Sequence, residues 1–138
     1  ETPSSSSLQM ASQFAKEALS LVEKQQSHWD GNEARRMLHR ALSLVALCYS
    51  RAGSAVTAEG LFQTVTEENR SNDAPEDPFH ALTRREALRY YADLCHDWEK
   101  READGDKLRQ RSADVNSKLG DGWRDKTAIF SGLWFYTL

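Results

Sequence analysis

One stretch of the chain, residues 41–65, constrains the fold more than any other, because its small, aromatic and glycine residues recur at helical spacing. Val45, Ala46 and Tyr49 place a large, a small and an aromatic side chain on one face of a first helix. Gly53 follows where a helix commonly closes in the left-handed conformation. The second helix carries the matching residues Ala58, Phe62 and Val65. The spacing predicts two antiparallel helices that pack closely as a hairpin.

The rest of the chain also has helical periodicity, and we find no alternating pattern typical of a strand. The expected fold class is therefore all-α, with five to six helices. These helices are expected over residues 8–24, 33–52, 55–68, 83–102 and 107–118, with the start of a sixth within 127–138. Residues 1–7 are expected to form a flexible segment, and residues 8–138 a single domain.

Capping and turn residues set the limits of the expected helices. Asp30 or Asn32 is expected to cap the second helix, because a short side-chain oxygen accepts hydrogen bonds from the first amides. A proline-containing loop is expected over residues 69–79. A capping box from Thr83 to Glu86 predicts the start of the fourth helix, and Gly105 is expected in the turn that follows it.

Composition narrows the classes of function. The 138 residues carry a net charge of −3, whereas a general nucleic-acid binder needs clustered lysine and arginine. No apolar run approaches the roughly 20 residues of a membrane span. Cys48 and Cys95 are expected as reduced, buried thiols. The chain begins at Glu1 without a methionine, so we interpret it as part of a longer protein, with an intracellular location, cytoplasmic or mitochondrial, favoured.

The candidate catalytic and metal-binding residues do not form a constellation. The histidines include no pair one helical turn apart, and Asp93, Cys95, His96 and Asp97 point around a helix rather than converge. The run Asp104–Asp106 lacks the later ligands of a calcium loop. We find no glycine-rich phosphate loop and no serine in a strand-to-helix turn. The sequence therefore predicts a protein that is not an enzyme and holds no cofactor or metal.

The residues of segment 41–65 together resemble the tetratricopeptide repeat, a two-helix unit that stacks into a right-handed solenoid. One repeat, at about residues 34–70, matches well, with Leu42 in place of the usual tryptophan and Arg70 in place of the terminal proline. A weaker match contains Leu88, Tyr91, Ala92 and Cys95. Leu42 and Leu88 lie further apart than one family period, so another helical-repeat solenoid stays open. The resemblance implies stacked antiparallel helical hairpins.

The resemblance also implies a binding surface, because partners of such arrays lie along the concave face formed by the first helix of each hairpin. The implied partner-binding positions are Arg40, Ser43, Leu47, Ser50 and Arg51 in the well-matched repeat, and Glu86, Arg89, Asp93, His96 and Asp97 in the weaker one. Family members that clamp the carboxylate of chaperone tails carry lysine and asparagine where this chain has Ser43 and Leu47, so no such clamp is expected. The mixed surface favours a folded partner or an amphipathic helix.

The expected function is that of a noncatalytic adaptor or scaffold, which binds a partner protein through the concave helical surface. The alternative is a structural subunit or assembly factor of a larger complex, such as a mitochondrial one. Aromatic residues late in the chain form either core or a docking patch: Trp98, Trp123, Phe130, Trp134, Phe135 and Tyr136. The identity of the partner and the oligomeric state stay open.

Overall fold

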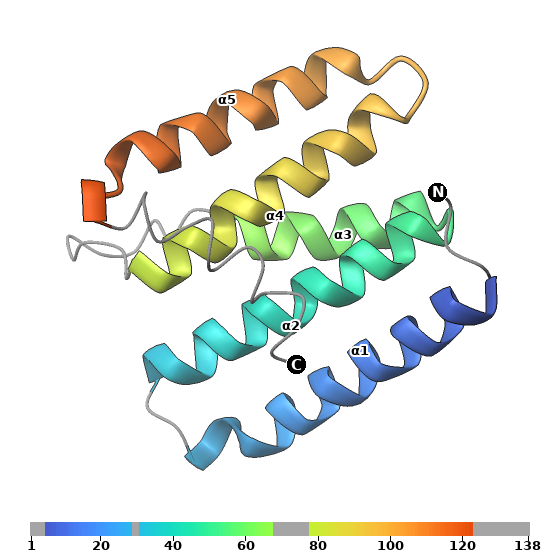
Figure 1. Ribbon diagram of the computed structural model, residues 1–138, viewed down its shortest axis with the longest axis vertical. Coiled ribbons are helices and arrows are strands. Elements are labelled where there is room, and N and C mark those ends of the chain that lie inside the picture. The colour runs from blue at the N-terminus through green and yellow to red at the C-terminus, as the bar shows by residue number, and fades with distance from the viewer. Residues whose placement is uncertain (1–4, 29–30, 68–77, 123–138) are drawn as a thin grey trace. The chain divides into compact units, whose positions relative to one another are not determined.

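The computed structural model describes residues 5–28, 31–67 and 78–122 (Figure 1). Across these ranges the chain forms α-helices and no strand, which confirms the predicted all-α class. The five helices are α1 (Ser5–Gln25), α2 (Gly31–Arg51), α3 (Ala55–Thr66), α4 (Pro78–His96) and α5 (Glu102–Lys118), and a short 3-10 turn, η1 (Gln26–His28), follows α1. The sixth predicted helix, the aromatic segment from Trp123 onward and the capping side chains of Asp30 and Asn32 lie outside the described residues.

The chain divides into two compact units. Unit one comprises residues 1–67 and contains α1, α2 and α3. Unit two comprises residues 68–138 and contains α4 and α5. Each unit is built from antiparallel helices joined end to end, and each has its own buried residues.

In unit one, α2 packs against both α1 and α3. Figure 1 shows the direction of the chain alternating along these three helices. The α2–α3 pair is the hairpin that residues 41–65 predict. Its buried side chains come from both helices: Val45 and Ala46 from α2, and Ala58, Phe62 and Val65 from α3.

A tight turn joins the two helices of this hairpin. Gly53 has a φ of 84°, in the left-handed region where a side chain is strained, as the sequence predicts. The amide of Gly53 donates to the carbonyl of Ser50 over 3.2 Å, and that of Ser54 donates to the carbonyl of Tyr49 over 2.9 Å. The last carbonyls of α2 are therefore satisfied by the turn itself.

Helix α1 begins at Ser5, earlier than the predicted Leu8. Its side chains Ala15 and Val22 are buried, and they lie two helical turns apart on one face. The small alanine lets the backbones of α1 and α2 approach, and the valine adds apolar area. Most of the remaining residues of α1 are exposed or half-buried, so the helix presents a large surface to solvent.

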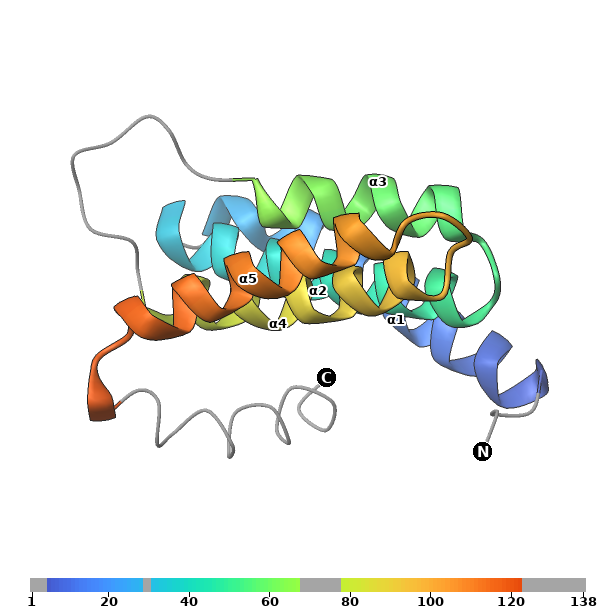
Figure 2. The same ribbon diagram turned by 90° about the horizontal axis from the view of Figure 1, so that it is seen from above.

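Unit two is a helical hairpin, and Figure 2 shows α4 and α5 side by side along their length. Its buried apolar side chains come from both helices: Leu88 and Cys95 from α4, and Leu108 and Val115 from α5. The turn between the helices includes Lys100, which has a φ of 66°.

The limits of α4 correct the prediction from the capping box. The helix begins at Pro78, because the fixed φ of proline suits the first helical position and its missing amide costs nothing there. Thr83 therefore lies inside the helix, where its hydroxyl donates to the carbonyl of Phe79 over 3.2 Å. The side chain of Glu86 accepts from arginines instead of reaching back to an amide.

The turn of unit two also differs from the prediction. Helix α4 ends at His96, and α5 begins at Glu102, so the predicted extension of α4 to residue 102 is wrong. Gly105 is a buried residue of α5 rather than a turn residue. A Cβ atom at Gly105 would lie 2.4 Å from Cδ2 of His96 and 3.1 Å from the carbonyl oxygen of Ala92. The glycine is needed because the two helices approach closely there.

Candidate functional site

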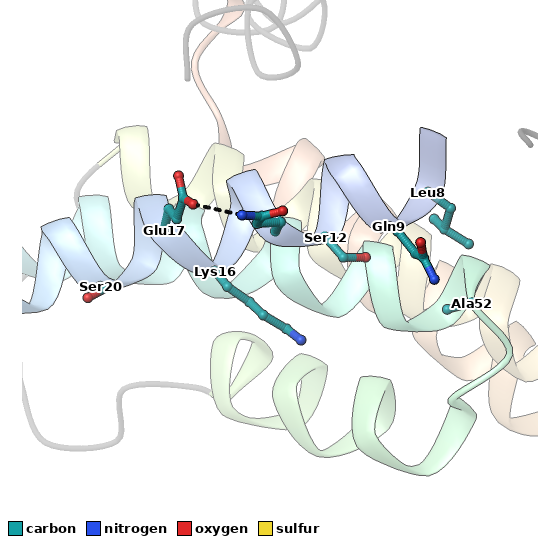
Figure 3. A pocket seen from close by; sticks show the side chains of 8 residues that line it. Leu8, Gln9, Ser12, Lys16, Glu17, Ser20 and Ala52 are labelled. Carbon is teal, nitrogen blue, oxygen red and sulfur yellow. Dashed lines mark hydrogen bonds between the residues drawn. The ribbon is translucent and has the colours of Figure 1, made fainter. Parts of the chain in front are cut away.

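A hollow that the described residues form lies along α1, in unit one (Figure 3). We call it the α1 groove. Its volume is about 650 Å³. The groove is lined by Leu8, Gln9, Ser12, Gln13, Lys16, Glu17 and Ser20 of α1, together with Ala52, which directly follows α2. Spacings of three and four residues bring these α1 side chains onto neighbouring positions of one helix surface.

The surface of the α1 groove is mainly apolar, and polar side chains of several kinds lie along it. Two hydroxyls and two amides accompany one cation and one anion. The amide of Gln13 donates to a carboxylate oxygen of Glu17 over 3.3 Å, which holds both side chains along the helix (Figure 3). The ammonium of Lys16 lies 5.1 Å from the centroid of the Tyr49 ring of α2, within the range of a cation–π contact. Lys16 is thereby held close to α2 while its charge stays near the groove.

Cys48 lies half-buried in α2 beside this surface. Burial raises the pKa of the Cys48 thiol, because the charged thiolate is poorly solvated there. A hydrogen bond from Ser12 and the charges of Arg51 and Lys16 oppose that shift without cancelling it. The thiol is therefore kept protonated, which does not favour a nucleophilic role.

The predicted partner-binding residues of unit one differ in how deeply they are buried. Ser43 is fully buried, and its hydroxyl donates to the carbonyl of His39 over 2.8 Å. Leu47 is buried as well. Arg40 is half-buried, and burial lowers the pKa of its guanidinium. Of this set, Ser50 is half-buried and Arg51 exposed, so these two and Arg40 are the ones with surface accessible to a partner.

In unit two, Glu86 is buried in a polar cluster that joins α4 to α5. It accepts from Nε of Arg85 over 3.1 Å and from Nη1 of Arg89 over 3.3 Å. Nη1 of Arg85 donates to Oδ1 of Asn116 over 3.0 Å, and the hydroxyl of Ser112 donates to the carbonyl of Arg85 over 3.1 Å. Glu86 therefore binds side chains of its own helix, and Arg85 makes the hydrogen bonds to α5.

The other predicted residues of unit two lie at or near the surface. Arg89 and Asp97 are exposed. Asp93 is exposed too, with a carboxylate oxygen 3.5 Å from Nη2 of Arg109. His96 is half-buried, and its Nε2 lies 3.3 Å from a carboxylate oxygen of Asp106. These four side chains therefore lie at or near the surface, whereas Glu86 is buried.

Sequence reasoning missed the α1 groove and the role of Arg85. The signal for the groove is a polar band on α1, in which Gln9, Ser12, Gln13 and Ser20 recur at helical spacing. The signal for Arg85 is weak, because a charged residue within an apolar helix pattern reads as a surface residue until its buried partners are known.

The described residues contain no group of three or more side chains that could hold a metal ion. Among the helices that the structure describes, none is long and apolar enough to cross a membrane. No protein-family model, curated protein or solved structure matches the chain.

Proposed function

We propose that this chain is a noncatalytic protein–protein interaction module that holds a segment of a partner protein on unit one. The α1 groove carries the proposal, because its mainly apolar surface includes four uncharged side chains that form hydrogen bonds, those of Gln9, Ser12, Gln13 and Ser20. Every polypeptide offers backbone amides and carbonyls as obligatory hydrogen-bonding groups. Amide and hydroxyl side chains pair with both kinds of group and require no particular charge of the partner.

The dimensions of the groove also support a polypeptide ligand. Its lining runs from Leu8 to Ser20 on α1, which corresponds to about 18 Å at the helical rise. An extended segment of about five residues covers that length. Helices that are already formed lose little conformational freedom on binding, which favours affinity. Arg51, a predicted partner-binding residue, is exposed near the same end of α2 as Ala52 of the groove.

Site-specific photo-crosslinking in the source cell tests this proposal. A photoreactive side chain at Gln9 or Ser20 is expected to capture one defined protein, because both positions line the groove. The same group at exposed Gln63 of α3 serves as the control and is expected to capture none. Equal capture at the three positions, or none at Gln9 and Ser20, would contradict the proposal.

Charge reversal offers a second test of the same function. We expect Arg51→Glu to weaken capture from the groove positions while the helical content measured by circular dichroism stays unchanged, since Arg51 is exposed. Unchanged capture would remove Arg51 from the predicted binding surface. The Arg40→Glu variant is less informative, because Arg40 is half-buried and its change also alters packing.

A second candidate function is that of a structural subunit within a larger assembly. One observation favours it: Met10, Phe14 and Leu21 of α1 are large apolar side chains, each more than half exposed. Apolar patches of this kind commonly mark a surface that another molecule covers. Sedimentation of the isolated chain separates the two functions, because an adaptor stays in solution as a defined monomer or dimer, whereas an obligate subunit aggregates without its neighbour.

A further inference from the structure

Helix α1 has a second surface, which adjoins the α1 groove at Glu17. Met10, Phe14 and Leu21 are exposed by 59%, 62% and 60%, and spacings of four and seven residues place them on one face. We call this set the α1 stripe. At about 100° per residue, Ala15 and Val22, which are buried, lie about a quarter of a turn away from it. The contacts of α1 within unit one therefore leave the α1 stripe open.

A shallow hollow of about 310 Å³ lies at one end of this stripe. It is lined by Ser6, Ser7, Met10, Ala11 and Phe14. Four of these residues, from Ser7 to Phe14, follow the i, i+3, i+4, i+7 spacing that forms a hole in knobs-into-holes packing. The small Ser7 and Ala11 leave room between Met10 and Phe14. The hollow therefore fits one large apolar side chain from a facing helix.

We propose that the α1 stripe docks on the same stripe of a second copy of this chain, with the two α1 helices antiparallel. Leu21 of each copy would enter the hollow of the other. Among the described residues of α1, Leu21 is the exposed large apolar side chain outside the hollow. It lies about 16 Å along the helix from the centre of the hollow, between Met10 and Ala11.

The antiparallel arrangement follows from having one projecting side chain and one hollow on the same helix. A two-fold axis near Ala15 and Lys16 exchanges the two ends of the stripe, so both leucines are buried at once. The same axis brings the two Phe14 rings close to each other at the centre. A parallel pair in register would place Leu21 against Leu21 and leave both hollows unfilled.

The charges near this axis predict a weak dimer. Glu17 borders the stripe, and its two copies approach each other close to the axis, where like charges repel. Added salt screens that repulsion, so association is expected to strengthen with ionic strength. Removal of the charge by Glu17→Gln is expected to tighten the dimer. This inference rests on apolar side chains that do not line the α1 groove, and Glu17 alone lies at the border of both surfaces.

Sedimentation equilibrium of the whole chain over a wide range of concentration tests the dimer. Leu21→Glu and Phe14→Glu are each expected to raise the dissociation constant at least about tenfold, because each places a charge in the apolar contact. Val56→Glu is the matched control, since Val56 is 74% exposed on α3 and lies outside the stripe. A dimer that survives both α1 variants, or that the control also weakens, would overturn the proposal.

Thiol crosslinking tests the antiparallel register. Met10→Cys and Leu21→Cys chains are prepared separately, with the wild type as the blank for the two native cysteines. A short bismaleimide is expected to join the two variants when they are mixed but neither variant to itself. Self-joining of each variant would mean a parallel pair and would overturn the proposal. A monomer at every concentration would overturn it as well, and would leave the stripe to another protein or to a lipid surface.

Discussion

At the scale of single residues, Gly105 is a position of unit two where even a methyl group would meet other atoms. The site is buried inside α5, against His96 and the backbone of Ala92 in α4. A helix interior normally gains stability when glycine is replaced by alanine. At Gly105 the added methyl group would instead meet a ring atom at 2.4 Å and a backbone oxygen at 3.1 Å. The ring can rotate away, whereas the carbonyl oxygen moves only with the helix.

We expect Gly105→Ala to destabilise the protein by about 1–3 kcal/mol, as overpacking does in other tightly packed cores. Gly60→Ala is the control, because Gly60 lies in α3 with no heavy atom within 4 Å of an added Cβ. The Gly60→Ala control is expected to raise the free energy of unfolding by up to about 1 kcal/mol, because alanine favours a helix more than glycine does. Urea unfolding measures both. Equal effects of the two substitutions would show that the helices do not approach closely at Gly105.

The Arg85–Glu86 pair is a second single-residue determinant of stability. Both side chains are about nine-tenths buried, whereas the side chain of Arg89, which shares the carboxylate, is 62% exposed. Removing one partner of a buried pair leaves an uncompensated charge inside the protein. We therefore expect Arg85→Met to cost about 3 kcal/mol, and Arg89→Ala less than about 1 kcal/mol.

Chemical denaturation of the two single variants and of Arg85→Met with Glu86→Leu checks this expectation. The double variant is expected to recover much of the loss, since it removes the stranded carboxylate together with its partner. A double variant as unstable as Arg85→Met alone would mean that packing, rather than charge, explains the effect.

Cys48 and Cys95 should differ in reactivity. Burial raises the pKa of the Cys48 thiol, so its thiolate fraction near neutral pH is below that of an unperturbed cysteine. Iodoacetamide is expected to modify Cys48 slowly, and more slowly still in Ser12→Ala, which loses a hydrogen bond that lowers this pKa. Cys95 is fully buried and is expected to react only after unfolding. Mass spectrometry of timed samples measures both rates; faster modification in Ser12→Ala would contradict the assignment.

The same shift fixes the sign of a pH effect. The folded-state pKa of Cys48 lies above its unfolded value, so the neutral thiol contributes stability below the unfolded pKa. That contribution is lost as pH rises through the folded pKa. Cys48→Ser should therefore flatten the alkaline decline of the free energy of unfolding.

At the scale of elements, the α2–α3 hairpin was the best predicted part of the chain. Small, aromatic and glycine residues at fixed spacing specify both its helices and its turn, and these depend on local geometry alone. Helix α4 was predicted less well. Thr83 and Glu86 match a capping box, but the helix begins at Pro78, so both residues lie inside it and cap nothing. The closeness of Gly105 to His96 is a contact between helices, and periodicity within one helix does not reveal such a contact.

Phe62 supports the hairpin as an element. Its side chain is fully buried, as is the adjoining Ala58. We expect Phe62→Ala to lower the free energy of unfolding by about 3–5 kcal/mol, through lost apolar burial and the cavity left behind. Phe79→Ala is the control on an aromatic that is 40% exposed, and its loss should be clearly smaller. Thermal unfolding followed by circular dichroism measures both, and equal losses would contradict the packing of α3.

At the scale of the whole molecule, the helices were predicted but their grouping into two units was not. Periodicity shows which face of a helix is apolar, and it does not show which other helix that face meets. For the same reason the predicted binding residues Ser43, Leu47 and Glu86 were placed on a surface and are buried in the structure. The hydroxyl of Ser43 bonds to a carbonyl of its own helix, and the carboxylate of Glu86 bonds to nearby arginines. Both residue types are usually exposed, so the sequence alone places them on the surface.

Hydrogen exchange resolved by peptide tests the division into units. Phe62→Ala is expected to speed amide exchange in α2 and α3, while Gly105→Ala is expected to speed it in α4 and α5, because each change acts within its own unit. Wild-type protein gives the reference rates. Uniform acceleration across all five helices in either variant would mean that the chain opens as one cooperative body.

The contact at Gly105 has a consequence for the evolution of this chain. A side chain at position 105 would be accommodated more easily if position 96 carried a residue shorter than histidine, with a small shift of the α4 backbone at Ala92. Among descendants of the same ancestor, the two positions should therefore change together, with histidine at 96 accompanied by glycine at 105. Large side chains at both positions 96 and 105 would indicate that α4 and α5 lie further apart in that relative.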